Sequence, residues 1–175
     1  LPKRHAEQLT MDHKIINEDD ASREGDRAAL IVVCRYDHWT QGYPANTKDS
    51  KDTKNSIKEY LGPGVTCEYS YSDNSEEIRV ACEDLGIPQG TSTPYRSVTN
   101  GQAENAVKRV NQGTSCVLYQ SGLAEPWWPY AMRAFCFLHN VLDIQVEGKT
   151  SYEKRNNAVF DGPIWAVGIE VKWQP

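Results

Sequence analysis

The stretch Ala28-Ala29-Leu30-Ile31-Val32-Val33-Cys34 is a continuous apolar run rich in β-branched residues. Such a run is typical of a central strand in a sheet. On its N-terminal side, residues 8–16 are expected to form a strand that ends near Asp12. On its C-terminal side, residues 36–43 are expected to form a third strand, paired antiparallel to the central one and closed by Pro44.

The rest of the chain alternates between helical and extended patterns. Helices are expected over residues 48–61, 75–85, 101–120 and 126–141, and a strand over residues 65–71. The Gly- and Pro-rich residues 86–100 are expected to be mostly loop, with one short strand. Near the end of the chain, residues 164–173 are expected to form one or two strands with a bend at Gly168. This order predicts a mixed α/β layer fold with a central sheet.

Length and composition indicate one globular domain. The 175 residues are 39% hydrophobic and 25% charged, and no stretch approaches the roughly 20 apolar residues that span a bilayer. The five cysteines are scattered and lack a C-x-x-C pair, which argues against a disulfide framework and against a thiolate zinc site. An intracellular, reducing setting is therefore expected.

The formal net charge of -5 counts against nucleic-acid binding, because proteins that bind nucleic acids are usually basic. The acidic residues are unevenly distributed, however, and five of them fall within residues 18–26. Four lysines line the helix expected over residues 48–61, and Lys108 with Arg109 follows Glu104. A local basic surface is therefore compatible with the negative total.

Three carboxylates stand in short motifs of their own: Leu9-Thr10-Met11-Asp12-His13-Lys14, Tyr71-Ser72-Asp73-Asn74-Ser75 and Thr99-Asn100-Gly101-Gln102-Ala103-Glu104. Taken singly, Asp73 with Ser75 is also a good helix-capping sequence, and residues 99–101 are also an ordinary turn. Asp12 is harder to explain in this way, because strands disfavour aspartate.

Taken together, the three carboxylates predict a metal site for phosphodiester chemistry. Mg²⁺ prefers hard oxygen ligands and is held by few carboxylates. Two such ions about 4 Å apart can activate an oxygen nucleophile, stabilise the leaving oxygen and neutralise the phosphate. Glu104 is expected in the first turn of its helix, where the helix dipole favours an anion.

In these motifs the chain resembles the catalytic core of retroviral and long-terminal-repeat retrotransposon integrases, which are Asp, Asp, Glu polynucleotidyl transferases. The resemblance covers about residues 8–172 and is most specific over residues 93–109. Residues 29–33 with Trp39, residues 128–131 with residues 139–140, and residues 148–153 also match. It implies an RNase H-like α/β fold: a central mixed five-stranded sheet flanked by helices, with a short C-terminal extension containing strands.

The same resemblance implies a domain layout and shows some departures. Residues 1–7 would be a linker from an upstream domain, residues 8–145 the core, and residues 146–175 a post-core extension or the start of a C-terminal β domain. Only 30 residues separate Asp73 from Glu104, fewer than in the retroviral pattern. Ser75 replaces a usual glycine, Arg35 stands where an aspartate is common, and the family's paired-cysteine zinc motif is not found here.

Carried over residue by residue, the resemblance implies roles for the site. Asp12 would bridge two Mg²⁺ or Mn²⁺ ions, Asp73 would complete one site and Glu104 the other. DNA, as element ends and target, would be the partner. The residues that would contact it are Asn100, Gly101, Gln102, Lys108, Tyr95 and Arg96. His13 would point to the opposite side of its strand and serve a structural role.

This resemblance implies 3′-end processing and DNA strand transfer by a homodimer or larger homo-oligomer, in the nucleus or in a virus-like particle, with no membrane partner. One alternative is a ribonuclease H, which would need a fourth carboxylate such as Asp143 or Asp161. Another is a degenerate or host-adopted copy that binds nucleic acid or assembles without catalysis.

Overall fold

The computed structural model describes residues 1–73, 75–91 and 101–170. A five-stranded sheet lies at its centre, with the spatial order β3-β2-β1-β4-β5. The strands are β1 (Gln8–Ile15), β2 (Ala28–Cys34), β3 (Thr40–Ala45), β4 (Tyr69–Ser72) and β5 (Gln89–Thr91). β2 pairs antiparallel with both β1 and β3, whereas β4 pairs parallel with β1 and β5 parallel with β4. The expected mixed five-stranded sheet is thus confirmed.

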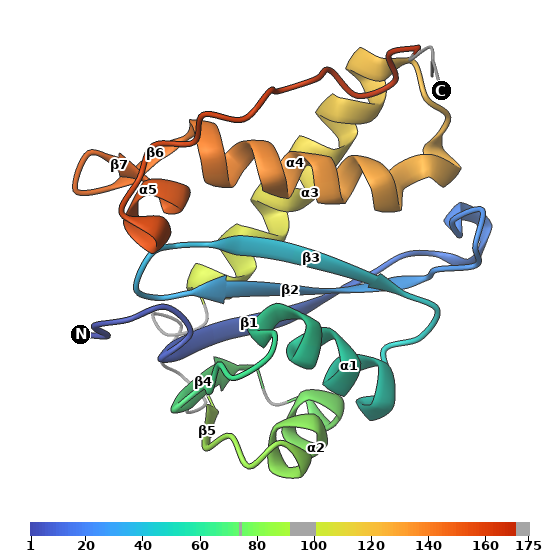
Figure 1. The fold of residues 1–175 in the computed structure, drawn as a ribbon. Coiled ribbons are helices and arrows are strands. Elements are labelled where there is room, and N and C mark those ends of the chain that lie inside the picture. The colour runs from blue at the N-terminus through green and yellow to red at the C-terminus, as the bar shows by residue number, and fades with distance from the viewer. Residues whose placement is uncertain (74, 92–100, 171–175) are drawn as a thin grey trace.

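Helices cover both faces of this sheet (Figure 1). One face is covered by α1 (Ser50–Leu61) and α2 (Glu76–Asp84), and the other by α3 (Gly101–Ser121) and α4 (Trp128–Leu142). Two short 3-10 helices, η1 (Glu18–Asp20) and η2 (Glu125–Trp127), lie in the connections. None of the described helices combines the length and apolar character of a bilayer-crossing segment.

The position of β2 in the middle of a sheet covered on both faces explains its continuous apolar sequence. Leu30 and Val32 belong to the core under α1 and α2, while Ala29 and Ile31 belong to the core under α3 and α4. Because successive side chains of a strand point to opposite faces, a strand covered on both faces must be apolar at every position. In β2 only Val33 is more than slightly exposed.

Predicted boundaries differ from the structure in three strands. β4 begins at Tyr69 instead of at residue 65. β1 continues past Asp12 because it pairs with β2 as far as Ile15, and only its pairing with β4 stops earlier. The third strand begins at Thr40 and contains Pro44, instead of running over residues 36–43. β3 is an edge strand of the sheet, where proline is tolerated because its missing N–H need not enter a ladder.

The C-terminal region also differs from the prediction. The hairpin of β6 (Ile144–Val146) and β7 (Lys149–Thr150) leads into α5 (Ser151–Asn156), which starts with a capping box. The part of the expected 164–173 strand that the structure describes, residues 164–170, is not a strand. This segment leads toward the C-terminal end of α3, where Gly168 lies beside Ser121 (Figure 1). Phe160, which precedes this segment, packs against Phe137 of α4. Ile164, Trp165 and Ile169 within the segment are exposed.

Candidate active site

The parallel pairing of β1 and β4 places two of the predicted carboxylates side by side. The ladder ends with Met11 opposite Ser72, and the next residue on each strand is Asp12 and Asp73 respectively. Because the two strands run in the same direction, both carboxylates emerge at the same end of the pair. Side chains commonly converge on ligands at such strand ends.

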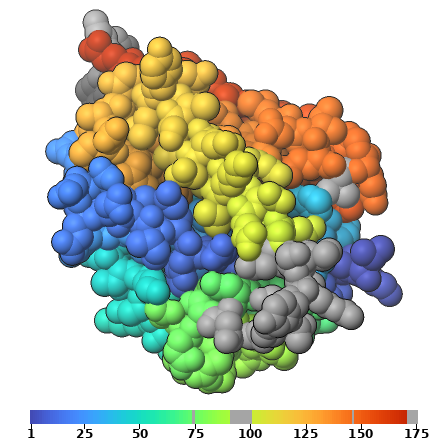
Figure 2. Space-filling view, turned by 180° about the vertical axis from the view of Figure 1, so that it is seen from behind, coloured from blue at the N-terminus to red at the C-terminus, as the bar shows by residue number. Residues whose placement is uncertain are grey.

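Strand alternation decides which face Asp12 occupies. Leu9 and Met11 lie in the core under α1 and α2, so Asp12 points to the opposite face. Its neighbour across the sheet, Ile31, lies in the core under α3 and α4. Glu104 lies in the first turn of α3, which runs over this face (Figure 2).

The pKa of Asp12 shows that all three carboxylates lie close enough to interact. Burial, which is the largest cause, and the negative charges of Asp73 and Glu104 together raise this pKa from 3.8 to about 6. The backbone N–H of His13, which donates to Asp12 Oδ1 over 2.8 Å, acts against this shift. The structure therefore brings together the three acids that the sequence singled out, and their mutual repulsion favours a bound cation.

Asp12, Asp73 and Glu104 do not form a compact group of ligand atoms. Among the described residues, only His5, Cys34 and Asp37 have ligand atoms that all lie within 4.8 Å of one another. Asp12, Asp73 and Glu104 are therefore more widely spaced than that.

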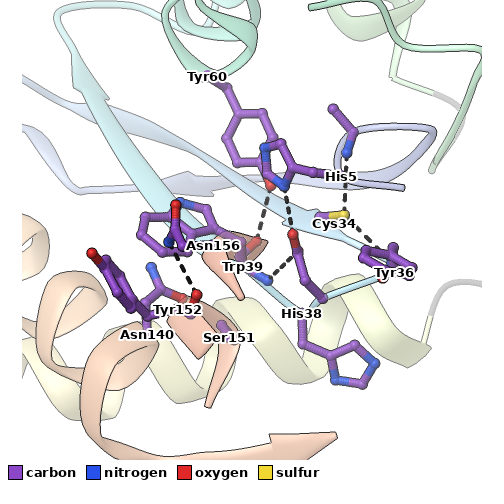
Figure 3. Close-up of polar contacts among 12 residues, drawn as sticks. His5, Cys34, Tyr36, His38, Trp39, Tyr60, Asn140, Ser151, Tyr152 and Asn156 are labelled. Carbon is purple, nitrogen blue, oxygen red and sulfur yellow. Dashed lines mark hydrogen bonds and ion pairs between the residues drawn. The ribbon is translucent and has the colours of Figure 1, made fainter. Parts of the chain in front are cut away.

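The His5, Cys34 and Asp37 cluster is a hydrogen-bond network (Figure 3). His5 Nδ1 lies 2.6 Å from Asp37 Oδ2, which is shorter than the separation of about 3.3 Å expected for two ligands of one tetrahedral zinc. Burial raises the pKa of the Cys34 thiol to about 12, so the sulfur stays protonated. The network fixes the N-terminal segment, expected to be a linker, against the turn between β2 and β3.

The Asp73 motif does not act as the expected side-chain cap. Asp73 Oδ1 accepts the N–H of Ser75 over 3.2 Å, and Ser75 occupies the N-cap position of α2 without a capping hydrogen bond. The Ser75 hydroxyl instead donates to Glu77, which forms an ion pair with Lys48 over 2.9 Å. These contacts hold the start of α2 in place behind Asp73.

The other predicted residues are distributed around the triad. Gly101 begins α3, and Gln102 and Lys108 are exposed on its first turns, with Lys108 one turn after Glu104. Asn100, Tyr95 and Arg96 lie outside the described residues. His13 lies on the α1 side of the sheet, where its Nε2 is 3.1 Å from Thr53 Oγ1. That position agrees with the expected structural role.

The candidates for a fourth carboxylate lie in other surroundings. Asp143 follows α4, and its Oδ2 is 2.6 Å from Nδ1 of the buried His139. Asp161 is exposed in the segment after α5. Neither contributes to the shift of the Asp12 pKa, whose acidic neighbours are Asp73 and Glu104. The geometry therefore gives no support to a ribonuclease H site.

Sequence reasoning missed a polar pocket of about 150 Å³ between the end of β2 and the start of α3. Its basic residues are Arg35, His38 and Arg109. The sequence signal at Arg35 was a charge directly after the apolar strand. Its proximity to Arg109 could not be inferred, because it depends on how α3 crosses the sheet.

Comparison with known proteins identifies the fold. No protein-family model matches the chain, and no curated protein sequence does. Among solved structures, the HTLV-2 integrase catalytic core domain in complex with magnesium, in a trimeric form, superposes with a TM-score of 0.67 at 12% identity. That match covers 87% of this chain and 98% of the other. The BIV integrase catalytic core domain gives a TM-score of 0.63 at 18% identity, covering 87% of this chain and 95% of the other.

A third match is a chain of the simian T-cell lymphotropic virus intasome in complex with the PP2A regulatory subunit B56 gamma. Its TM-score is 0.70 at 13% identity, and the match covers 97% of this chain and 61% of the other. The chain thus has an RNase H-like fold. More narrowly, it has the fold of retroviral integrase catalytic cores, as the motif resemblance led us to expect.

Proposed function

We propose that this chain is an integrase catalytic core, which performs metal-dependent 3′-end processing and DNA strand transfer for a retrotransposon or retrovirus-like element. The observation that carries the proposal is the convergence of Asp12, Asp73 and Glu104 on an integrase-core fold. A fold alone hosts many functions, whereas a specific group of side chains defines a reaction.

Asp12, Asp73 and Glu104 are the residues that would hold divalent metal. Two Mg²⁺ or Mn²⁺ ions, when bound, supply Lewis acidity at the nucleophile, the leaving oxygen and the phosphate. The donor set fits: all three are carboxylates, and burial together with the charges of Asp73 and Glu104 raises the pKa of Asp12 to about 6. At neutral pH the Asp12 carboxylate is therefore mostly deprotonated and available as a ligand. The negative charges of Asp73 and Glu104 repel it, and a bound cation would relieve that repulsion.

The surroundings of the triad supply positioning groups for DNA. Lys108 is exposed one helical turn after Glu104, a position from which its ammonium can reach a phosphate. The first N–H groups of α3, beginning at Gly101, face the same end of the helix and favour an anion there. DNA ends and target DNA are the partners that this arrangement suits.

The assembly and the location belong to the same proposal. One structural neighbour is trimeric and another is part of an intasome. A homodimer or larger homo-oligomer on DNA is accordingly proposed here, acting in the nucleus or in a virus-like particle. Residues 8–145 would be the catalytic core of that assembly.

A disintegration assay tests the proposal. Branched DNA that mimics the strand-transfer product is incubated with Mg²⁺ or Mn²⁺ and with the native chain, Glu104→Gln or the control Glu125→Gln in exposed η2. Metal-dependent resolution of the branch by the native chain and by the control, but not by Glu104→Gln, is the expected result.

Two other outcomes are informative. A folded native chain that neither resolves the branch nor gains thermal stability from Mg²⁺ would overturn the proposal and favour a degenerate or host-adopted copy. Such a copy is the main alternative, since Arg35 stands where the integrase pattern commonly has an aspartate. Equal activity of Glu104→Gln and the native chain would overturn the assignment of Glu104.

A further inference from the structure

The polar pocket at the end of β2 lies close to the carboxylate triad and differs from it in charge. We define it by Arg35, His38, Gln102, Asn105 and Arg109, and call it the basic pocket. Among the described residues, no carboxylate lines it. In a chain with a net charge of -5, a pocket that presents two guanidinium groups and amide donors has the chemistry of an anion site.

The pKa of His38, which lines this pocket, depends on the charges around it. Burial is the largest cause of its lowered pKa, and the positive charges of Lys154, Arg109 and Arg35 lower it further. The negative charge of Asp37 acts in the opposite direction and more strongly than any one of these cations; Asp37 is fully buried and bonded to His5. His38 and His5 lie on opposite sides of the turn between β2 and β3 (Figure 3). The charges of Arg35 and Arg109 therefore act on the ring of His38, and no carboxylate is among the described residues that line the pocket.

Arg109 is held in place although its side chain is exposed. Its Nη1 lies 3.2 Å from Nε2 of His139, and His139 Nδ1 lies 2.6 Å from Asp143 Oδ2. A neutral imidazole that donates from Nδ1 to Asp143 accepts from Arg109 at Nε2. His139 is only 4% exposed and stacks on Phe135, so it is a rigid anchor for the guanidinium.

The sheet register relates the basic pocket to the triad. Val33, which lines the pocket, pairs with Thr10, and Thr10 pairs with Tyr71. This row lies two residues before Asp12 and Asp73 on the same face, or about 7 Å along the strands. Arg35 lies beside this row of paired residues, since its guanidinium carbon is 5.1 Å from the centroid of the Tyr71 ring.

We propose that the basic pocket binds a backbone phosphate of the DNA strand, next to the phosphate that reacts at the triad. Arg35 and Arg109 donate to its non-bridging oxygens, and Gln102 and Asn105 supply further amide donors. Arginine suits this role because its planar fork matches phosphate oxygens and its charge is permanent. This inference rests on the proposed function, since it takes the triad as the place where the scissile phosphate sits.

Salt dependence of DNA binding gives the first test. Binding of the branched DNA is measured by fluorescence anisotropy in the Glu104→Gln background, so that no chemistry intervenes. Arg109→Ala should lower the slope of log K against log salt by about 0.9 for a lost duplex phosphate contact. The control is Arg79→Ala on α2, whose guanidinium is already paired with Glu76 and Glu83. It should leave the slope unchanged.

Chemically modified DNA gives the second test. Single neutral methylphosphonates are placed at each phosphate near the branch, and binding is measured for Glu104→Gln with and without Arg109→Ala or Arg35→Ala. One phosphate beside the scissile one should weaken binding about tenfold when neutralised, as expected for a lost charged hydrogen bond. In the arginine variants, neutralising the same phosphate should cause little further loss.

The outcomes separate this inference from the proposed function. An unchanged salt slope for Arg109→Ala, or equal sensitivity to the methylphosphonate with and without the arginines, would overturn the basic pocket as a phosphate site. Both measurements use catalytically blocked protein and read binding alone. Failure of branch resolution by the native chain would instead count against the enzymatic proposal.

Discussion

Asp12→Asn is expected to stabilise the metal-free protein at neutral pH while abolishing its stabilisation by Mg²⁺. In the native chain, burial and the charges of Asp73 and Glu104 raise the pKa of Asp12 from 3.8 to about 6. An asparagine keeps the size of the side chain and can still accept the N–H of His13. It carries no charge, so the repulsion disappears.

The sign and size of the effect follow from this pKa. Because the folded-state value is raised, the favourable contribution of Asp12 is fully present below pH 3.8 and is lost as the pH rises through about 6. A shift of about 2 pH units corresponds to a ceiling of about 3 kcal/mol. Since the side chain is half-buried and screened by solvent, we expect an observed gain of about 1 kcal/mol. For a chain of this size that raises Tm by about 2–4 °C.

The assay is thermal unfolding between pH 4 and 8, with and without Mg²⁺. Without metal, the variant should equal the native chain near pH 4 and exceed it above pH 6. At a Mg²⁺ concentration of about 100 times Kd, the native chain should gain about 2.7 kcal/mol and the variant none, so that their order reverses. Asp19→Asn in exposed η1 removes the same charge elsewhere and should show neither effect.

Two results would refute this reasoning. A metal-free Asp12→Asn that is less stable than the native chain at pH 7.5 would show that Asp12 is not under repulsion. A difference between the two proteins that stays constant from pH 4 to 8 would show that ionisation of Asp12 is not its cause.

Three further predictions follow from contacts in the site and the core. Asp73→Asn should remove most of the Mg²⁺-dependent rise in Tm while leaving the fold intact by circular dichroism, because it removes one ligand charge. Gly113→Ala should destabilise the protein by about 1–3 kcal/mol in urea unfolding, despite the better helix propensity of alanine, because the new Cβ would lie 2.1 Å from the Phe135 ring. Asn140→Ala should lower the free energy of unfolding by about 2–4 kcal/mol, because it removes the partners that the buried N–H and C=O of Thr40 have at 2.9 and 2.8 Å. Urea unfolding also measures this loss. Ser115→Ala, on the exposed face of α3, is the control for the Gly113 and Asn140 variants and should leave stability nearly unchanged.

Much of the fold could be read from local sequence. The apolar run of β2 predicted a central strand because such a run must be covered on both faces, and its neighbours in the two cores show this. The long helices α3 and α4 were predicted to within two residues at each end, since their periodic apolar residues and flanking glycine and proline are local signals. The three acids were singled out because each lies in a short motif of consecutive residues.

Other features depended on residues far along the chain. β1 runs past Asp12 because β2 pairs with it there, and Pro44 is accommodated because β3 happens to be an edge strand. The apolar residues after α5 were predicted to form a strand, but residues 164–170 are not a strand, and Ile164, Trp165 and Ile169 are exposed. Local sequence reports the preference for burial, and it does not report which surface provides that burial.

The sequence by itself determined the elements, the apolar faces and the identity of the three acids, because these depend on residues within a few positions of one another. Only the tertiary structure decided that Asp12 and Asp73 emerge together from parallel strands, and that their charges and that of Glu104 act on one another. It also decided that Arg35 and Arg109 share a pocket. Electrostatic interaction depends on distance in space, which the chain sets only after strands pair and helices cross the sheet.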